Sequence, residues 1–324
     1  MKRLFLSLFV AFSIFNSVLQ AKLEDHFKKI ENKSNIHKMR NIDFIYLINL
    51  DQRPEKFQKC IDQLHPYGIY PYRFSAVNGW ELTLEDINDV GLKFEPGMQG
   101  GFMATSYLTP DLKPTHNLVE NFGQAYFVHC FARGTIGICL SHLSILQDAY
   151  DSGYKTIWVM EDDIEVIRDP TIIPDLIDQL NKAVGKNNWD VLFTDRDFRN
   201  GNGEYTGCSA DARRPNFNPV KKNDYALKKD INPVFRKIGS RYGAHSMIIS
   251  RRGIAKILNF IKSHKIFLPY DLDFYLPLGI NLYTVREDVV ANLPKAISDN
   301  GGANYLKKDK DKNKDKNKDK KKEN

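Results

Sequence analysis

Three short apolar runs, each ending in polar or acidic residues, constrain the fold of this 324-residue chain more than any other feature. Residues 44–48 lead into Asn49, residues 156–160 lead into three consecutive acids, and the run that begins at Trp189 leads into Asp195. Unbroken apolar runs are typical of strands that are buried on both faces. Segments with helical spacing alternate with these runs. The alternation predicts an α/β fold with a mainly parallel sheet and helices on both faces.

The remaining elements follow from apolar spacing and from capping residues. They are a helix from Pro54 to Leu64, a strand over residues 69–76, a short helix capped by Thr83 and Asp86, a helix over residues 134–150, a strand over residues 245–249 and a helix capped by Ser250. Residues 95–125 lack periodicity and are rich in Gly, Thr, Asn and Pro, so we expect a functional lid or a disordered excursion there. With no internal repeat and no second core, a single domain is expected over residues 41–306.

The first 21 residues have the pattern of an export signal. Lys2 and Arg3 precede an apolar run over residues 4–19, and Ala21 supplies a small residue for cleavage. An uncleaved signal anchor is the alternative, although a helix of that length falls short of the roughly 30 Å hydrocarbon core. We therefore expect a protein that is exported or membrane-anchored through residues 1–21 (secretory lumen, periplasm or membrane surface), with weak membrane association. It would be cytosolic if the signal is not used.

The net charge of +7 lies at the two ends of the chain. Residues 307–324 hold ten Lys against four Asp and one Glu, and they contain no apolar residue, so a disordered tail is expected. When the twelve basic and five acidic residues of the two ends are subtracted, residues 22–306 carry 35 basic and 35 acidic residues. A neutral body gives no support to a nucleic-acid partner.

Several common catalytic motifs are absent from the sequence. It contains no P-loop, no GxGxxG turn between a strand and a helix, and no GxSxG elbow, which argues against ATPases, dinucleotide enzymes and α/β-hydrolases. The cysteines show no CxxC pair and no zinc spacing, so we interpret them as buried small hydrophobes or, in an exported chain, as one of three disulfide pairings. They are Cys60, Cys130, Cys139 and Cys208.

The acidic triplet Glu161-Asp162-Asp163 is the strongest chemical signal. Adjacent carboxylates repel one another unless a cation compensates them, and hard divalent ions prefer oxygen ligands. Alternate residues of an extended segment point the same way, so Glu161 and Asp163 can face one ion together. In open α/β sheets ligands collect at the carboxyl ends of the strands, which is where the triplet is expected. The alternative is a solvated acidic turn.

Four other polar residues are candidates with weaker signals. His142 lies on an almost wholly apolar helix. It is either a core histidine or a residue whose hydrogen bond shapes the site. Arg53 lies beside a helix start, where it can contact a phosphate or remain a surface residue. Asp271 and Asp273 lie in a short acidic turn, and either can be a general base.

Taken together, these segments resemble glycosyltransferase family 25, which includes lipopolysaccharide galactosyltransferases and collagen hydroxylysine galactosyltransferases. The order and spacing of the matching pieces make the resemblance specific. They are residues 45–55, 74–79, 134–142, 160–163, 189–191, 242–250 with Gly253, and 269–273. Residues 95–125 have no counterpart in this pattern, so the acceptor preference does not carry over.

The resemblance implies a GT-A type nucleotide-diphospho-sugar transferase fold, a UDP-sugar donor and a requirement for Mn²⁺ or Mg²⁺. It implies Glu161 and Asp163 as metal ligands, with His245 completing the shell or touching the diphosphate. It also implies a donor pocket lined by Asn49, Leu50, Arg53, Ala76, Asn78, Gly79, Ser141, His142 and Asp162. The family is inverting, so a carboxylate must deprotonate the acceptor; Asp271, Asp273 and, third, Asp195 are the candidates.

The expected function is transfer of a hexose, galactose above all, from a UDP-sugar to a hydroxyl of a glycan or glycoprotein, for example in lipopolysaccharide biosynthesis. A second hypothesis is a catalytically silent protein of the same fold that binds nucleotide sugars or glycans. A third is a metal-dependent phosphoesterase that uses the same carboxylates.

Overall fold

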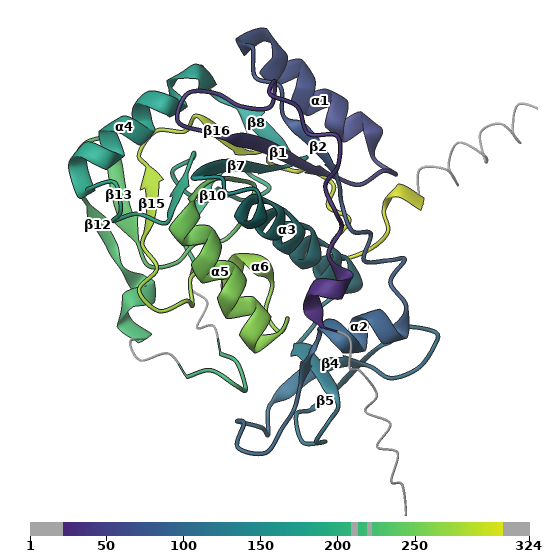
Figure 1. The fold of residues 1–324 in the computed structure, drawn as a ribbon. Coiled ribbons are helices and arrows are strands. Elements are labelled where there is room, and N and C mark those ends of the chain that lie inside the picture. Colours follow the sequence, from purple (N-terminus) through teal and green to yellow (C-terminus); the bar gives the residue numbers. More distant parts are fainter. Residues whose placement is uncertain (1–21, 209–212, 219–221, 307–324) are drawn as a thin grey trace, which may run out of the picture.

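The computed structural model describes residues 22–208, 213–218 and 222–306 (Figure 1). Within these residues, eight strands form one sheet in the order β12-β13-β15-β9-β14-β7-β1-β2. They are β1 (Phe44–Asn49), β2 (Tyr72–Ser75), β7 (Thr156–Glu161), β9 (Val191–Phe193), β12 (Lys228–Asp230), β13 (Phe235–Ile238), β14 (Ser246–Ser250) and β15 (Leu282–Val285).

This sheet is mixed, which corrects the prediction of a mainly parallel one. The pairs β1–β2, β1–β7 and β9–β15 are parallel, whereas β7–β14, β9–β14, β13–β15 and β12–β13 are antiparallel. The prediction assumed that each strand returns in the same direction after a helix. Instead, the long connection between β9 and β14 brings β14 back in the opposite direction between β9 and β7.

Helices cover both faces of the sheet, as predicted. Alternate side chains of the strands divide into two hydrophobic clusters: Tyr46 and Val159 belong to one, Leu47 and Trp158 to the other. Helices α3 (Arg133–Asp151) and α5 (Arg251–His264) cover the first face, and α1 (Pro54–Leu64) and α4 (Ile173–Val184) cover the second (Figure 1). Because side chains alternate along a strand, unbroken apolar runs can supply both cores.

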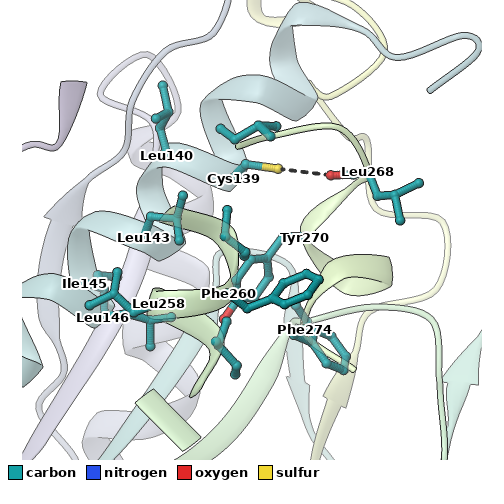
Figure 2. Close-up of a cluster of buried hydrophobic side chains, with 14 of the residues drawn as sticks. Cys139, Leu140, Leu143, Ile145, Leu146, Leu258, Phe260, Leu268, Tyr270 and Phe274 are labelled. Atoms are coloured by element: carbon teal, nitrogen blue, oxygen red, sulfur yellow. Dashed lines mark hydrogen bonds between the residues drawn. The ribbon is translucent and has the colours of Figure 1, made fainter. Parts of the chain in front are cut away.

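Helix α3 is the central packing element of the first face. Its residues Leu140, Leu143 and Leu146 are almost completely buried and lie in the cluster with α5 and α6 (Tyr270–Asp273) (Figure 2). The Sγ atom of Cys139 also lies 3.9 Å from the carbonyl oxygen of Leu268, just before α6. Packing against α3 therefore fixes the position of α6, which carries two of the acids considered above.

Residues 95–125 do not form a disordered excursion, so that part of the prediction was wrong, whereas a functional lid stays a prediction. About a third of them belong to a small antiparallel sheet of β3 (Leu92–Lys93), β6 (Ala125–Val128), β4 (Met103–Tyr107) and β5 (Pro114–Leu118), beside α2 (Leu84–Val90). The strand β4 carries the polar residues Thr105 and Ser106, both buried, and β5 is almost wholly exposed. Neither strand has the apolar pattern on which the prediction relied.

The shorter elements complete the described chain. They are β8 (Ile164–Val166) paired with β16 (Val290–Asn292), β10 (Phe198–Arg199) paired with β11 (Tyr205–Thr206), and the 3₁₀ turns η1 (Leu23–His26), η2 (His65–Tyr67), η3 (Pro170–Ile172) and η4 (Lys222–Ala226). Leu23 in η1 is fully buried in the first cluster, so the packed body begins before residue 41. No helix in the described ranges is long and apolar enough to span a membrane. The predicted signal (1–21) and tail (307–324) lie outside the described residues.

Candidate active site

Two adjacent pockets lie at the carboxyl ends of the parallel strands β2, β1 and β7. The first has a volume of about 580 Å³, counting space that is open to solvent, and is bordered by Asn49 at the end of β1 and by Ala76 just after β2. The second has a volume of about 1290 Å³ on the same basis and is bordered by Tyr242, Pro269 and neighbouring loops. Five residues border both pockets: Ile138, Glu161, Asp163, Ser298 and Asn300. The acidic end of β7 therefore forms part of the wall between them.

The first pocket brings together seven of the nine residues predicted to bind a donor. They are Asn49, Leu50, Ala76, Asn78, Gly79, Ser141 and Asp162. The Ser141 hydroxyl accepts a hydrogen bond from the Val77 amide at 2.8 Å and donates to the Gly137 carbonyl at 2.8 Å. This bridge holds the turn after β2 against α3.

Two glycines allow the walls of this pocket to approach one another. A Cβ atom on Gly79 would lie 1.9 Å from the Arg133 carbonyl oxygen, and one on Gly134 would lie 2.5 Å from the carbonyl oxygens of Asp299 and Asn300. Any side chain at either position would separate the segments. The start of α3 is thus in backbone contact with both the 76–79 turn and residues 299–300.

Arg53 and His142 were predicted to bind the donor but lie behind the pocket wall. The buried Arg53 guanidinium donates to Asp299 at 2.5 Å and to Glu55 at 2.8 Å. It therefore holds residues 298–300 in place instead of facing a phosphate. The His142 ring stacks on Tyr270 with 4.1 Å between centroids, and its Nε2 donates to Glu161 Oε1 at 2.9 Å. His142 is the residue that shapes the site, the alternative given above.

Each acid of the triplet has a different environment. Glu161 accepts the hydrogen bond from His142. Asp162 accepts hydrogen bonds from Asn49 at 2.7 Å and from Lys56 at 3.2 Å. The Oδ1 atom of Asp163 is buried and has no hydrogen-bond partner among the described residues. Glu161 and Asp163 border both pockets whereas Asp162 borders only the first of the two, although Asp162 and Asp163 lie in a turn after β7 and not in the extended segment that was assumed.

The electrostatics of the triplet fit a divalent cation. Burial and then the neighbouring charge of Glu161 raise the pKa of Asp163 to about 6. Burial also raises the pKa of Asp162, although Lys56 and Asn49 oppose it. For Glu161 burial acts in the same direction, but the hydrogen bond and charge of His142 bring the pKa below its ordinary value. An unpaired buried oxygen among like charges is the environment that an oxygen-ligated cation relieves.

The three candidate bases are in very different places. Asp271 borders the second pocket, where it accepts a hydrogen bond from the Gly243 amide at 2.9 Å, and burial raises its pKa. Asp273 is buried against the Arg214 guanidinium and is absent from the walls of both pockets in the described chain. Its carboxylate is occupied by that ion pair, so Asp273 no longer qualifies as the base.

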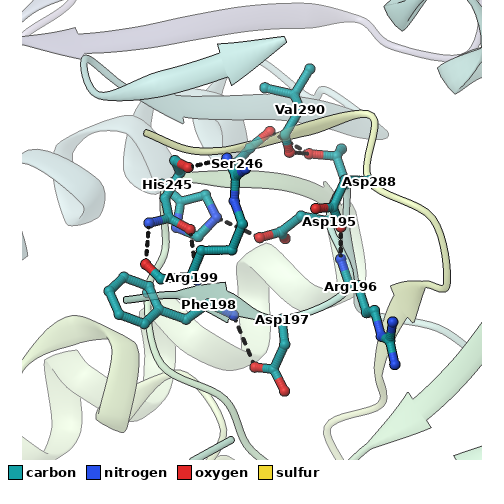
Figure 3. A network of polar contacts seen from close by, with 12 residues as sticks. Asp195, Arg196, Asp197, Phe198, Arg199, His245, Ser246, Asp288 and Val290 are labelled. Atoms are coloured by element: carbon teal, nitrogen blue, oxygen red, sulfur yellow. Dashed lines mark hydrogen bonds and ion pairs between the residues drawn. The ribbon is translucent and has the colours of Figure 1, made fainter. Parts of the chain in front are cut away.

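Asp195 is also excluded as the base by its contacts. It is fully buried, and Arg241 donates to its two oxygens at 2.8 and 3.0 Å. His245 Nε2 donates to the same carboxylate at 2.7 Å (Figure 3). Despite burial, the charge of Arg241 and the contacts with Arg241 and His245 hold the pKa of Asp195 well below its usual range. Asp195 therefore orients His245, which borders the second pocket together with Glu161 and Asp163.

Sequence reasoning missed three residues of the site. Lys56 is the one basic side chain among the described residues that border the first pocket, and Asp299 and Trp80 also line it. The Trp80 indole donates to the Asp299 carbonyl oxygen at 2.7 Å. Lys56 lies one helical turn after Arg53, and this position is the one feature of the sequence that could have pointed to it as a site residue. Asp299 has no signal in the sequence, because the partners that tie it to the pocket, Arg53 and Trp80, are more than 200 residues away.

Comparison with known proteins identifies the family. The family model described as glycosyltransferase family 25 (LPS biosynthesis protein) matches residues 42–274, well over half of the chain. The chain belongs to glycosyltransferase family 25. This confirms the resemblance drawn from the sequence, and the match includes the acidic triplet and Asp271.

Curated relatives carry the same family name. A "Glycosyltransferase 25 family member" from Drosophila melanogaster is 28% identical over 174 residues, 54% of this chain and 24% of the relative. One from Aedes aegypti is 26% identical over 155 residues, 48% of this chain and 21% of the relative. The human "Inactive glycosyltransferase 25 family member 3" is 24% identical over 156 residues, 48% of this chain and 22% of the relative. Each match spans less than a quarter of the relative's own length.

Proposed function

We propose that this member of glycosyltransferase family 25 is a metal-dependent, inverting hexosyltransferase that moves a sugar from a UDP-sugar to an acceptor hydroxyl. The observation that carries the proposal is the wall of Glu161 and Asp163 between two pockets, with one buried carboxylate oxygen that has no hydrogen-bond partner in the described part of the chain. A transferase needs a donor site and an acceptor site that meet at the reacting bond. Two pockets that share an acidic wall support this proposal, and a GT-A type fold is part of it.

The first pocket suits the donor. Its described walls carry the acids Glu161, Asp162, Asp163 and Asp299 and the single base Lys56, so a bare diphosphate would be repelled. Glu161 and Asp163 would hold Mn²⁺ or Mg²⁺, with His245 oriented by Asp195 as a third ligand. When bound, the ion would neutralise the charge that develops on the leaving diphosphate. Lys56 and the N-terminal end of α3 add positive potential on the same side.

The second pocket suits the acceptor. Asp271 borders it and can remove the proton from an acceptor hydroxyl. The hydroxyl oxygen then forms a bond to the anomeric carbon of the sugar as the bond from that carbon to the diphosphate oxygen breaks. The proton ends on Asp271 and the electron pair leaves with UDP. Attack from the face opposite the diphosphate inverts the anomeric centre.

For the finer assignments, the proposal keeps galactose as the first donor to test and a glycan or glycoprotein as acceptor. Lipopolysaccharide biosynthesis is the first pathway to examine, because the matching family model is described as an LPS biosynthesis protein. Export or membrane attachment through residues 1–21 is part of the same proposal.

The test is UDP release by the purified full-length chain with a panel of UDP-sugars, with Mn²⁺ and with a chelator. We expect slow hydrolysis of one donor, lost on chelation and restored by the metal. Simple phosphate esters serve as the control, and their hydrolysis would indicate the phosphoesterase instead. One human relative is named inactive, so a silent binding protein is the second candidate. UDP binding without release from any donor, even with an acceptor panel, would favour that candidate.

A further inference from the structure

A second cluster of metal-ligating side chains lies on the small antiparallel sheet. The ligand atoms of His116, His129 and Cys130 all lie within 4.8 Å of one another, and they form the one such group of three found among the described residues. His116 belongs to β5, whereas His129 and Cys130 directly follow β6. All three side chains are exposed, and they lie apart from the residues that border the two pockets.

We propose that His116, His129 and Cys130 form a binding site for a borderline-soft divalent cation, with Zn²⁺ as the best-fitting ion. Two imidazoles and a thiolate are ligands that zinc prefers, whereas Mn²⁺ and Mg²⁺ prefer the carboxylates of the active site. Three protein ligands leave the fourth tetrahedral position to water. The site is therefore chemically distinct from the one between the pockets.

The strand order explains how residues distant in sequence meet. Strand β4 lies between β5 and β6, and Thr105 of β4 pairs with His116 on one side and with Phe127 on the other. His129 and Cys130 lie in the turn that follows β6, and this turn brings them beside His116. The two imidazole rings are 4.8 Å apart between centroids, at 68° to each other. A cation would thus connect the two strands that flank β4.

A partner on the sheet already orients His116. Its Nδ1 lies 3.2 Å from the Thr105 hydroxyl, which is buried, so Nε2 is the nitrogen available for a metal. A histidine ligand whose other nitrogen is hydrogen-bonded is the usual arrangement in zinc sites. Bond lengths of about 2.0–2.3 Å to zinc require ligand atoms about 3.3–3.7 Å apart. The exposed side chains reach that spacing by closing about 1 Å.

Binding changes the protonation of the cysteine. The Cys130 thiol loses its proton to solvent as the sulfur–metal bond forms, so no oxidant or reductant takes part. The bound site would tie β5, the exposed edge strand, to the end of β6. A cation here therefore stabilises the hairpin rather than taking part in sugar transfer.

The test is a Co²⁺ titration of the reduced, metal-free full-length protein, because cobalt reports tetrahedral thiolate ligation by its absorption whereas zinc is spectroscopically silent. We expect one equivalent to give a thiolate-to-cobalt charge-transfer band in the near ultraviolet, and one equivalent of Zn²⁺ to abolish it. Cys130→Ser should remove the band, and His116→Asn or His129→Asn should weaken cobalt binding at least about tenfold.

Matched variants separate this site from other causes. Cys208→Ser and His65→Asn change residues of the same types elsewhere and should leave the titration unchanged. The metal-free variants should keep the wild-type melting temperature, because the three side chains are exposed. Absence of the band in the wild type, its persistence in Cys130→Ser, or its loss in Cys208→Ser would overturn the proposal.

Discussion

At the scale of single residues, Asp163 carries the most information about function. A buried carboxylate without a hydrogen-bond partner destabilises the folded chain unless a ligand compensates it. Its Oδ1 lacks such a partner within the described ranges, and its pKa of about 6 reflects burial and the charge of Glu161. A residue kept at this cost indicates a site selected for binding rather than for stability.

The first prediction concerns this residue. Asp163→Asn should lower metal-dependent UDP release by about 10²-fold or more, because it removes a charged ligand while keeping the shape of the side chain. The melting temperature should stay the same or rise, since a buried charge is lost. Asp62→Asn, on the exposed face of α1, is the control and should leave both quantities unchanged. Normal turnover and an unchanged metal requirement in Asp163→Asn would end the assignment.

The second prediction concerns the pH dependence set by Asp271. Burial raises its pKa; the Gly243 amide and His142 oppose this shift, and Glu161 adds to it. A base must be deprotonated, so turnover should fall as the pH falls through this raised pKa, above the ordinary value of about 4. Asp271→Asn should reduce turnover about 10²–10⁴-fold while UDP still binds. The residual turnover should no longer fall at low pH, so the acid limb of the pH profile should be lost.

Asp273→Asn is the informative comparison for that measurement. It breaks the ion pair with Arg214 and leaves the guanidinium buried, so it should lower stability by about 3–5 kcal/mol. At temperatures where this variant is folded, its pH profile should match that of the wild type. An acid limb that is unchanged in Asp271→Asn but shifted in Asp273→Asn would reverse the two roles.

At the scale of elements, the segment of residues 298–300 closes one side of both pockets. Its position depends on the buried pair of Arg53 and Asp299 and on the hydrogen bond from Trp80 to the Asp299 carbonyl oxygen. The third prediction follows. Asp299→Asn should lower the free energy of unfolding by about 3–5 kcal/mol, because Arg53 keeps its charge in a buried position. It should also weaken UDP binding, measured by calorimetry.

A second partner of the same arginine supplies the control. Glu55 is more exposed than Asp299, so Glu55→Gln should change stability by less than about 1 kcal/mol. Equal losses in urea-induced unfolding for the two variants would show that the segment is held by other contacts.

The elements also show how far the sequence could be interpreted. Strands β1 and β7 and the acids after β7 were predictable because an unbroken apolar run indicates burial on both faces. The hairpin of β4 and β5 was not, because its strands carry polar residues such as Thr105 and Asn117. The roles of Asp195 and Asp273 depend on Arg241 and Arg214, whose proximity arises only in the folded chain.

At the scale of the whole molecule, the packed body extends beyond the domain predicted from residue 41. Leu23 is fully buried, the Lys28 amide donates to Ser144 of α3 at 3.0 Å, and Glu24 pairs with Lys262 of α5 at 2.7 Å. The residues before β1 therefore contact both helices of the first face.

The fourth prediction follows from these contacts. A chain of residues 41–306 should be less stable than one of residues 22–306 by at least about 1.5–3 kcal/mol, the contribution of one buried leucine. Urea-induced unfolding of the two proteins measures the difference. Removing residues 307–324 should leave stability and turnover unchanged, because that segment has no apolar side chain to bury. Equal stability of the chains of residues 41–306 and 22–306 would show that the N-terminal contacts contribute little.

The way in which the two pockets are assembled has a consequence for divergence within the family. Apart from the five shared residues, the first pocket is built mainly from residues 48–56, 76–80 and 134–141, and the second mainly from residues 198–201, 242–245, 269–271 and 292–296. Substitutions in the C-terminal stretches can therefore reshape one substrate site and leave the other intact. If the first pocket holds the donor and the second the acceptor, as proposed, a lineage of such proteins can keep one activated sugar while it acquires new acceptors.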